Sequence, residues 1–208
     1  MSLRAAPCTL TLVRHGETPA NISGLWHGSL DTQLTARGER QAARVGLHVA
    51  RTRGDVRALY ASTLTRARRT AEAIGARVGL AVATEAALCE YDLGAWEGRS
   101  YAELVREERL FERMAKEPDW RPGGGESARA VAERLAGALR TIAARHAGER
   151  VVVVSHGGAL TLAFGLLLDG DPGVWRRVMD NAAVSELTLH PEPRLHRFNE
   201  VHHLDGLA

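Results

Sequence analysis

Ionisable side chains follow four short apolar runs of this sequence, near the points where buried strands are expected to end. Arg14 and His15 follow the first run, Arg66 the second and Glu90 the third, and His156 comes after a run of four valines. Guanidinium groups match the oxygens of a phosphate, and a helix that begins at His156 adds free backbone N–H groups that favour an anion. The sequence therefore predicts a cationic site for a phosphoryl group.

These residue types suit phosphoryl transfer through a covalent intermediate. A neutral imidazole at His15 can attack phosphorus, and Glu90 can protonate the leaving oxygen and later activate water. Arginines can neutralise the charge on the equatorial oxygens, a role that Mg²⁺ often fills. Taken singly, each residue also has a structural alternative. Arg66 could lie on a solvated helix face, and His156 could be a hydrogen-bonded histidine at a helix cap.

Alternating strands and helices must position these side chains. Four central strands are expected at residues 8–13, 56–61, 80–84 and 151–154. Helices are expected at 38–51, from a cap at Ser62 or Thr63 to about 78, at 127–146 and at 157–168, with an edge hairpin at 184–189 and 195–201. The pattern predicts an α/β fold, a three-layer αβα arrangement with a mostly parallel sheet flanked by helices. The carboxyl ends of such strands meet at one edge, where ligands bind.

Residues 92–125 interrupt this alternation. They contain a polar helix at about 101–116, then Pro118, Pro122 and three consecutive glycines. We expect a single domain, 1–208, in which 92–125 is a lid-like insertion that covers the site; a plain surface insertion is the alternative.

Other motifs predict less. The chain has neither a GxxxxGK[ST] phosphate loop nor a GxGxxG motif, which disfavours nucleoside triphosphates and dinucleotides. Ser155 lacks the glycine two positions earlier that a nucleophile elbow requires. His202 and His203, with His196, are expected to form a solvated tail rather than a metal site. We expect neither a metal nor a cofactor.

The composition is that of a soluble globular protein. The chain has 208 residues, 45% hydrophobic and 25% charged, and a formal net charge of +2, which disfavours nucleic-acid binding. No apolar run is long enough to span a membrane, and the first 13 residues do not resemble a signal peptide, so a cytoplasmic location is expected. Cys8 and Cys89 are expected to be small buried side chains. A homodimer through an edge strand is left open.

The motifs as a set resemble those of the histidine phosphatase superfamily, which includes the cofactor-dependent phosphoglycerate mutases. The matching segments occur in the family's order and are spread over residues 10–158, about three quarters of the chain. They are LVRHGET at 12–18, LTARG at 34–38, YASTLTRA at 60–67, EYDLGAWEG at 90–98, GGES at 124–127 and VSHGG at 154–158.

The resemblance implies a role for each matching residue. His15 would be the phosphorylated nucleophile and Glu90 the general acid and then the base. Further residues would bind the phosphoryl group or the substrate: Arg14, Arg66, His156, Asn21, Thr18 and Gly157. Asn181 is expected near the site, and the family needs no metal.

Three departures indicate that the chain is closer to the small-molecule phosphatases than to the mutases. The chain is shorter than the mutases, and it lacks their Arg-His-Tyr-Gly-type run after Glu90. It also lacks the Lys and paired Arg that hold a carboxylate, since Lys116 is its only lysine. We therefore expect a small phosphomonoester as substrate. A phosphoglycerate mutase and a catalytically inactive phospho-ligand binding protein are the alternatives.

The identity of the substrate is not predicted. The loop at 25–31 and the segment at 92–125 are expected to select it, with Trp26 and His27 contacting the leaving group or only packing. Sugar phosphates, phosphoglycerates, nucleoside monophosphates and the ribazole phosphate of cobalamin synthesis are all candidates.

Overall fold

A six-stranded sheet forms the centre of the computed structural model, which describes residues 6–53, 55–174 and 177–207. Its order is β3-β2-β4-β1-β5-β6. The strands are β1 (Thr9–Arg14), β2 (Val56–Ala61), β3 (Val82–Thr84), β4 (Arg150–Ser155), β5 (Val184–Thr188) and β6 (Arg194–Glu200). The first four strands run parallel, and β5 is antiparallel to both β1 and β6. The predicted mostly parallel sheet and its edge hairpin are confirmed.

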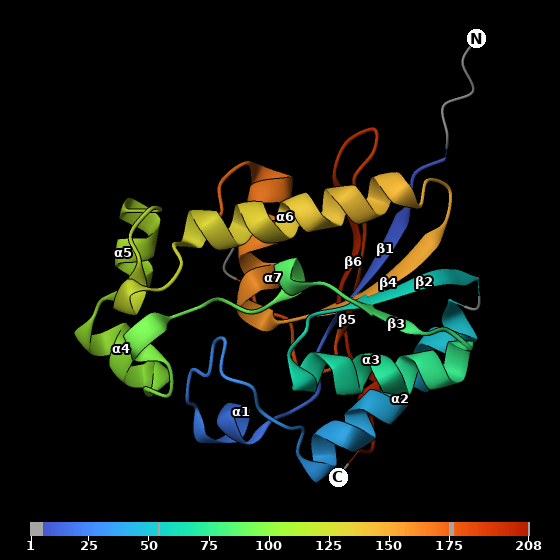
Figure 1. The fold of residues 1–208 in the computed structure, drawn as a ribbon, viewed down its shortest axis with the longest axis horizontal. Helices are drawn as coiled ribbons and strands as arrows, with labels where there is room; N and C mark the ends of the chain where they lie inside the picture. Colours follow the sequence, from blue (N-terminus) through green and yellow to red (C-terminus); the bar gives the residue numbers. More distant parts are fainter. Residues whose placement is uncertain (1–5, 54, 175–176, 208) are drawn as a thin grey trace.

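Helices cover both faces of the sheet, which gives the three expected layers. In Figure 1, α2 (Ala36–Thr52) and α3 (Thr65–Val78) lie below the sheet, whereas α6 (Ala128–Arg145) and α7 (Gly157–Phe164) lie on the opposite side. A short helix, α1 (Pro19–Ser23), follows β1, and a π-helical turn at Gly165–Asp169 continues α7. Within the described ranges, no helix is both long and apolar enough to cross a bilayer.

The four consecutive valines of β4 are buried on both faces of the sheet. Val151 and Val153 belong to the apolar cluster formed with α6 and α7. Val152 and Val154 belong to the cluster formed with α2 and α3. Successive side chains of a strand point to opposite faces, so a central parallel strand must be apolar at every position.

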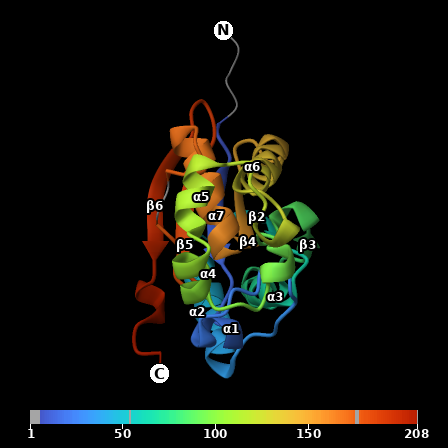
Figure 2. The same ribbon diagram turned by 90° about the vertical axis from the view of Figure 1, so that its left-hand side faces the viewer.

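The polar helix expected at about 101–116 is two helices. They are α4 (Tyr101–Glu107) and α5 (Leu110–Lys116), and Arg109 between them has a left-handed φ of 49°. Leu104 on one side of the break and Leu110 on the other are both fully buried. Figure 1 shows the pair standing away from the sheet, and Figure 2 views the molecule from their side.

Backbone-to-backbone contact closes the base of the segment at 92–125. A Cβ atom added to Gly123, whose φ is +58°, would lie 2.2 Å from the carbonyl oxygen of Leu93. A Cβ atom added to Gly94 would lie 2.3 Å from the carbonyl oxygen of Gly123. Only glycine fits such an approach, which explains part of the three-glycine run.

Two expectations about single side chains are wrong. Cys8 is buried, but Cys89 is only half-buried and its sulfur lies 3.1 Å from the Thr63 hydroxyl. The solvated tail is wrong for His203, whose ring stacks on that of His48 on α2 at 4.7 Å and lies 3.0 Å from the Ala182 carbonyl oxygen, whereas His202 is exposed as expected.

Candidate active site

The two site histidines lie side by side because their strands are neighbours in register. Arg14 at the end of β1 pairs with Ser155 at the end of β4, and the backbone N–H of His15 donates to the Ser155 carbonyl at 3.0 Å. The next residue on each strand is therefore a histidine. The ring centroids of His15 and His156 are 5.1 Å apart, and both side chains are almost fully buried. The structure thus brings these two predicted residues together.

The His15 ring is held in one tautomer. Its Nδ1 lies 2.7 Å from the Gly16 carbonyl oxygen, so Nδ1 carries the proton and donates it, leaving the lone pair on Nε2. Burial, followed by the charges of Arg66 and Arg14, holds the pKa of His15 well below its usual value of 6.5. The ring is therefore neutral at neutral pH, which is the form that can act as a nucleophile.

His156 is held in the complementary tautomer. The Nε of Arg66 donates to its Nδ1 at 3.2 Å, so the proton of the neutral ring resides on Nε2. Burial and then the charge of Arg66 also hold the pKa of His156 well below 6.5. Nε2 is buried and has no hydrogen-bond partner among the described residues, although buried donors are normally paired. A phosphoryl oxygen would satisfy it.

Arg66 is completely buried, so a solvated helix face is excluded for it. Besides orienting His156, its terminal nitrogens donate to the carbonyl oxygens of Leu30 at 2.7 Å and Gly28 at 2.6 Å. Arg66 thus fixes the loop at 28–30, and each of its terminal nitrogens carries a second N–H.

Asp31 completes this loop, and its role was not predicted. Its carboxylate accepts from the backbone N–H of Thr65 at 2.7 Å and from the Thr65 hydroxyl at 2.6 Å. Asp31 therefore caps α3 from outside the helix. The expectation that Ser62 or Thr63 caps α3 is wrong, because Leu64 is the N-cap residue and has no side-chain cap bond.

The Arg14 guanidinium packs closely against Gly157. Its Nη1 donates to the Met179 carbonyl oxygen at 2.5 Å, whereas its Nε is buried without a partner among the described residues. A Cβ atom added to Gly157 would lie 3.1 Å from Arg14 Cζ. Gly157 thus gives the guanidinium its room, and the unpaired Nε is a second donor available to an anion.

Glu90 sits at the start of α7. One carboxylate oxygen accepts from the backbone N–H of Tyr91 at 2.9 Å and of Ala159 at 2.6 Å, and the other accepts from Gly158 at 3.0 Å. A helix N-terminus offers unpaired N–H groups and a favourable dipole for a carboxylate. Glu90 therefore lies beside the helix that His156 precedes.

Arg134 of α6 holds the segment that carries Glu90, and sequence reasoning missed it. Its terminal nitrogens donate to the carbonyl oxygens of Ala87, Cys89 and Glu90 at 3.0, 3.0 and 3.2 Å. It also forms a two-point ion pair with Glu126 at 2.8 and 2.7 Å. No local signal separates this arginine from the others of an arginine-rich sequence.

Thr18 and Asn21 form the turn after β1. They make a reciprocal capping box at the start of α1, and the Asn21 side-chain oxygen also accepts from Asn181 at 3.0 Å. Asn181 further donates to the His15 carbonyl oxygen at 3.2 Å, so it lies at the site as expected. Thr18 is fully buried and acts here as a cap, whereas Asn21 lines the cavity.

A cavity of about 620 Å³ extends from these groups toward α4 and α5. Arg14, His15 and Glu90 line one end. His27 lies in the wall with its Nε2 unpaired among the described residues, and burial, followed by the charges of Arg66 and Arg14, lowers its pKa to about 4. The described side chains include no group of three or more that could hold a metal ion.

Comparison with known proteins gives concordant results. The model of the histidine phosphatase superfamily (branch 1) matches residues 10–201. The chain is 37% identical over 206 residues to a probable phosphoglycerate mutase GpmB of Klebsiella pneumoniae, with 95% of each chain covered. Among solved structures, it resembles a mycobacterial glucosyl-3-phosphoglycerate phosphatase in complex with VO3 (30% identity, 93% and 99% of the two chains, TM-score 0.83).

A second solved structure is a phosphoserine phosphatase from Entamoeba histolytica in complex with 3-phosphoglyceric acid. It shares 27% identity over 95% of this chain and 99% of the other, with a TM-score of 0.84. Both solved relatives are phosphatases that act on small phosphorylated molecules, whereas the sequence relative is named as a mutase. The chain described here belongs to branch 1 of the histidine phosphatase superfamily.

Proposed function

We propose that the chain hydrolyses phosphomonoesters of small molecules through a phosphohistidine on His15. The main support for this proposal is that the two histidines at the ends of β1 and β4 are held in complementary tautomers. Nε2 of His15 holds a free lone pair, and Nε2 of the adjacent His156 holds an unpaired N–H. One ring can attack phosphorus while the other donates to a phosphoryl oxygen.

Arg14 and Arg66 would share the negative charge of the transferred group. Both guanidinium groups lie in the buried cluster around His15, where their charges act in a medium of low dielectric constant. They supply the positive charge that a metal ion supplies in many phosphoryl-transfer enzymes. We therefore propose a reaction that needs no metal.

Glu90 would handle the proton in both steps. Its carboxyl group gives a proton to the leaving oxygen as the P–O bond breaks and His15 takes the phosphoryl group. Its carboxylate then accepts a proton from the water that attacks the phosphohistidine, and inorganic phosphate leaves. The N–H groups of Tyr91, Gly158 and Ala159 stabilise the carboxylate form, which the second step requires.

The segment at 92–125 is proposed to cover the site of a single-domain enzyme. Tyr101 on α4 and Met114 on α5 line the cavity that begins at His15. The segment therefore forms part of the cavity wall and is more than an insertion on the surface.

A phosphoglycerate mutase remains the second candidate, and the relationship to a probable GpmB favours it. A mutase must hold the substrate carboxylate and exclude water while the intermediate turns over. Arg14 is the only cation among the described residues that line the cavity, and it belongs to the phosphoryl end. This observation favours hydrolysis, and the intact His15 and Glu90 disfavour a chain that only binds its ligand.

Phosphate release from a panel of monoesters, measured in EDTA with His15→Ala beside the wild type, tests the proposal. We expect release from the wild type that EDTA does not reduce and that the variant lacks. Interconversion of 3- and 2-phosphoglycerate without release would establish the mutase instead. Release by His15→Ala at the wild-type rate would refute the phosphohistidine mechanism.

A further inference from the structure

We infer that the alcohol released from the substrate is uncharged and predominantly apolar, with a ring that the cavity wall can contact. This inference names the substrate class and rests on the proposed function. It starts from the uneven distribution of charge along the cavity of about 620 Å³. That volume lies within the range of roughly 300–1,000 Å³ typical of sites for ring-bearing small molecules.

Among the described lining residues, charge is confined to the phosphoryl end of the cavity. Arg14 and Glu90 are the only charged side chains among its described lining residues, and both adjoin His15 and the start of α7. The rest of the described lining is apolar, aromatic or uncharged. A carboxylate or a second phosphate on the leaving group would lose water there without gaining a positively charged partner among the described lining residues, which is costly.

Aromatic rings form the wall nearest α4. The Trp26 ring lies 5.5 Å from that of Tyr101 at an angle of 54° and 6.1 Å from that of Tyr91 at 86°. All three residues line the cavity. Aromatic rings pack against one another in offset or edge-on geometry, and a ring on the ligand can contact these side chains in the same way.

The wall is held in place by the backbone. The N–H of Trp26 donates to the Arg99 carbonyl oxygen at 2.9 Å, and the N–H of Gly98 donates to the Trp26 carbonyl oxygen at 2.7 Å. The aromatic surface therefore exists before a ligand binds, which reduces the cost of binding. Met114 completes the far side, and a thioether side chain adapts to apolar ligands of different shape.

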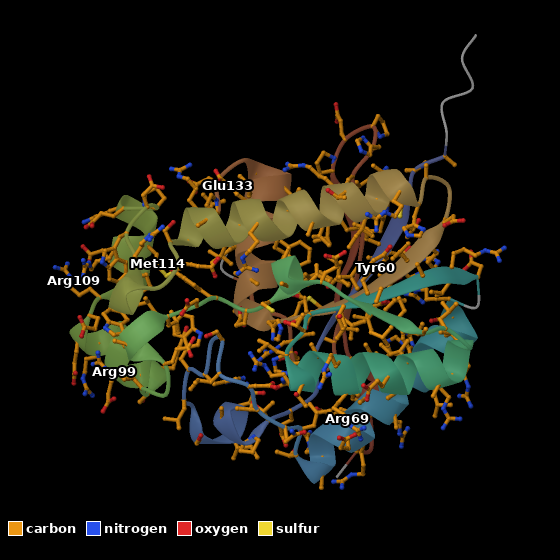
Figure 3. All side chains as sticks on the ribbon, viewed as in Figure 1. Tyr60, Arg69, Arg99, Arg109, Met114 and Glu133 are labelled. Carbon is orange, nitrogen blue, oxygen red and sulfur yellow. The ribbon has the colours of Figure 1, made fainter. Side chains whose placement is uncertain are left out.

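Two arginines of the segment at 92–125, Arg99 and Arg113, are engaged elsewhere. Arg99 forms ion pairs with Glu108 at 3.0 Å and with Glu107 at 3.7 Å, and Arg113 lies over the Trp120 ring at 3.8 Å. In Figure 3, Arg99 and Arg109 lie toward the outer edge of this segment, whereas Met114 lies nearer α7. None of these arginines lines the cavity.

Three esters separate the possibilities: 1-naphthyl phosphate, glycerol 2-phosphate and 3-phosphoglycerate. We expect kcat/KM for 1-naphthyl phosphate to exceed that for each of the other two by about 10- to 100-fold, the range that apolar contacts in a pocket usually give. Equal or better turnover of 3-phosphoglycerate or glycerol 2-phosphate would overturn the inference while leaving the phosphatase proposal intact.

Two variants test the wall from opposite directions. Tyr101→Ala should lower kcat/KM for 1-naphthyl phosphate about ten-fold and change that for glycerol 2-phosphate by less than about two-fold. Ile22→Ala, which removes an exposed apolar side chain outside the cavity lining, is the matched control and should change neither. Met114→Lys should raise kcat/KM for 3-phosphoglycerate, because it supplies the missing cation. Equal effects of Tyr101→Ala on both esters would contradict the assignment.

Calorimetric binding to His15→Ala separates failure of the inference from failure of the proposed function. Tighter binding of 1-naphthyl phosphate than of 3-phosphoglycerate supports the substrate class even if no ester is hydrolysed. Equal or weaker binding of 1-naphthyl phosphate overturns it, whatever the activity of the wild type.

Discussion

Replacing Arg134 by leucine should damage both stability and catalysis, although Arg134 does not line the cavity. Arg134→Leu removes the donors to the carbonyl oxygens of Ala87, Cys89 and Glu90. It also leaves the Glu126 carboxylate without its two-point partner. The substitution therefore releases the segment that carries the proposed acid and base.

The size of the effect follows from the hydrogen bonds that the Arg134 guanidinium makes. A hydrogen bond to a charged group contributes about 1.5–3 kcal/mol, but several bonds made by one side chain do not add. The Arg134 side chain also retains 23% exposure, so in the variant water replaces part of these interactions. We therefore expect the free energy of unfolding to fall by about 2–4 kcal/mol.

Catalysis should fall more than the decrease in folded protein explains. Displacing a catalytic group by about 1 Å can cost roughly 100-fold in rate. We expect kcat for the best phosphomonoester to fall by about that factor under conditions where urea titration shows that the variant is folded. Arg134→Lys should recover stability better than rate, because one ammonium cannot reach all three carbonyl oxygens and both oxygens of Glu126.

Arg129→Leu is the matched control on the same helix. Arg129 pairs with Asp119 at 3.0 Å, and the two side chains are 44% and 77% exposed. Such a pair contributes little, so the change should be within about 0.5 kcal/mol with kcat unaltered. Equal unfolding free energies for the two leucine variants, or full kcat in folded Arg134→Leu, would refute the positioning role.

Three further changes test other parts of the account. Folding lowers the pKa of His27 from 6.5 to about 4. Between these two pH values the unfolded chain binds a proton at His27 that the folded chain does not. The free energy of unfolding therefore decreases as the pH falls from 6.5 toward 4. In urea titrations over this window, His27→Gln should lessen that pH dependence by at most about 1.4 kcal/mol per pH unit, and an unchanged slope would contradict the assignment. Gly123→Ala should lower the free energy of unfolding by about 1–3 kcal/mol, because the new Cβ would clash with the Leu93 carbonyl oxygen and alanine disfavours the left-handed φ at this position. An unchanged thermal melt would contradict this, because it would show that the backbone around Gly123 can shift to accept a side chain. Arg66→Lys should lower kcat/KM by about 100-fold, because a lysine cannot hold both His156 and the loop at 28–30 in place. A kcat/KM close to that of the wild type would exclude this role for Arg66.

The central strands and the two site histidines could be predicted because both depend on local pattern. A buried parallel strand must be apolar throughout, so its end is visible where polar residues begin. Parallel neighbours end at the same edge, and this rule alone brings His15 and His156 together. The tautomers of the two rings could not be predicted, because each depends on a partner that only the folded chain supplies, the Gly16 carbonyl for one and Arg66 for the other.

Residues that act across long sequence separations were missed. Asp31 caps a helix that begins at Thr65, and Arg134 holds a segment about 45 positions earlier in the chain. Asp and Arg are also common on protein surfaces, so neither residue stands out in the sequence. Hydrophobic periodicity does not predict contacts between polar residues that lie far apart in the chain. The break at Arg109 was also missed, because helix propensity favours one continuous helix there, whereas Arg109 takes a left-handed φ.

The most direct test of the central claim is to trap and locate the phosphorylated residue. The Glu90→Gln variant, which cannot activate water, is mixed rapidly with 4-nitrophenyl phosphate, whose leaving group needs no proton from Glu90 in the first step. The protein is then digested at alkaline pH and analysed by mass spectrometry. The account predicts one acid-labile phosphoryl group on the peptide that contains His15, bonded to Nε2, and none in the His15→Ala, Glu90→Gln double variant. A phosphoryl group on another residue, or steady turnover by the double variant, would contradict it.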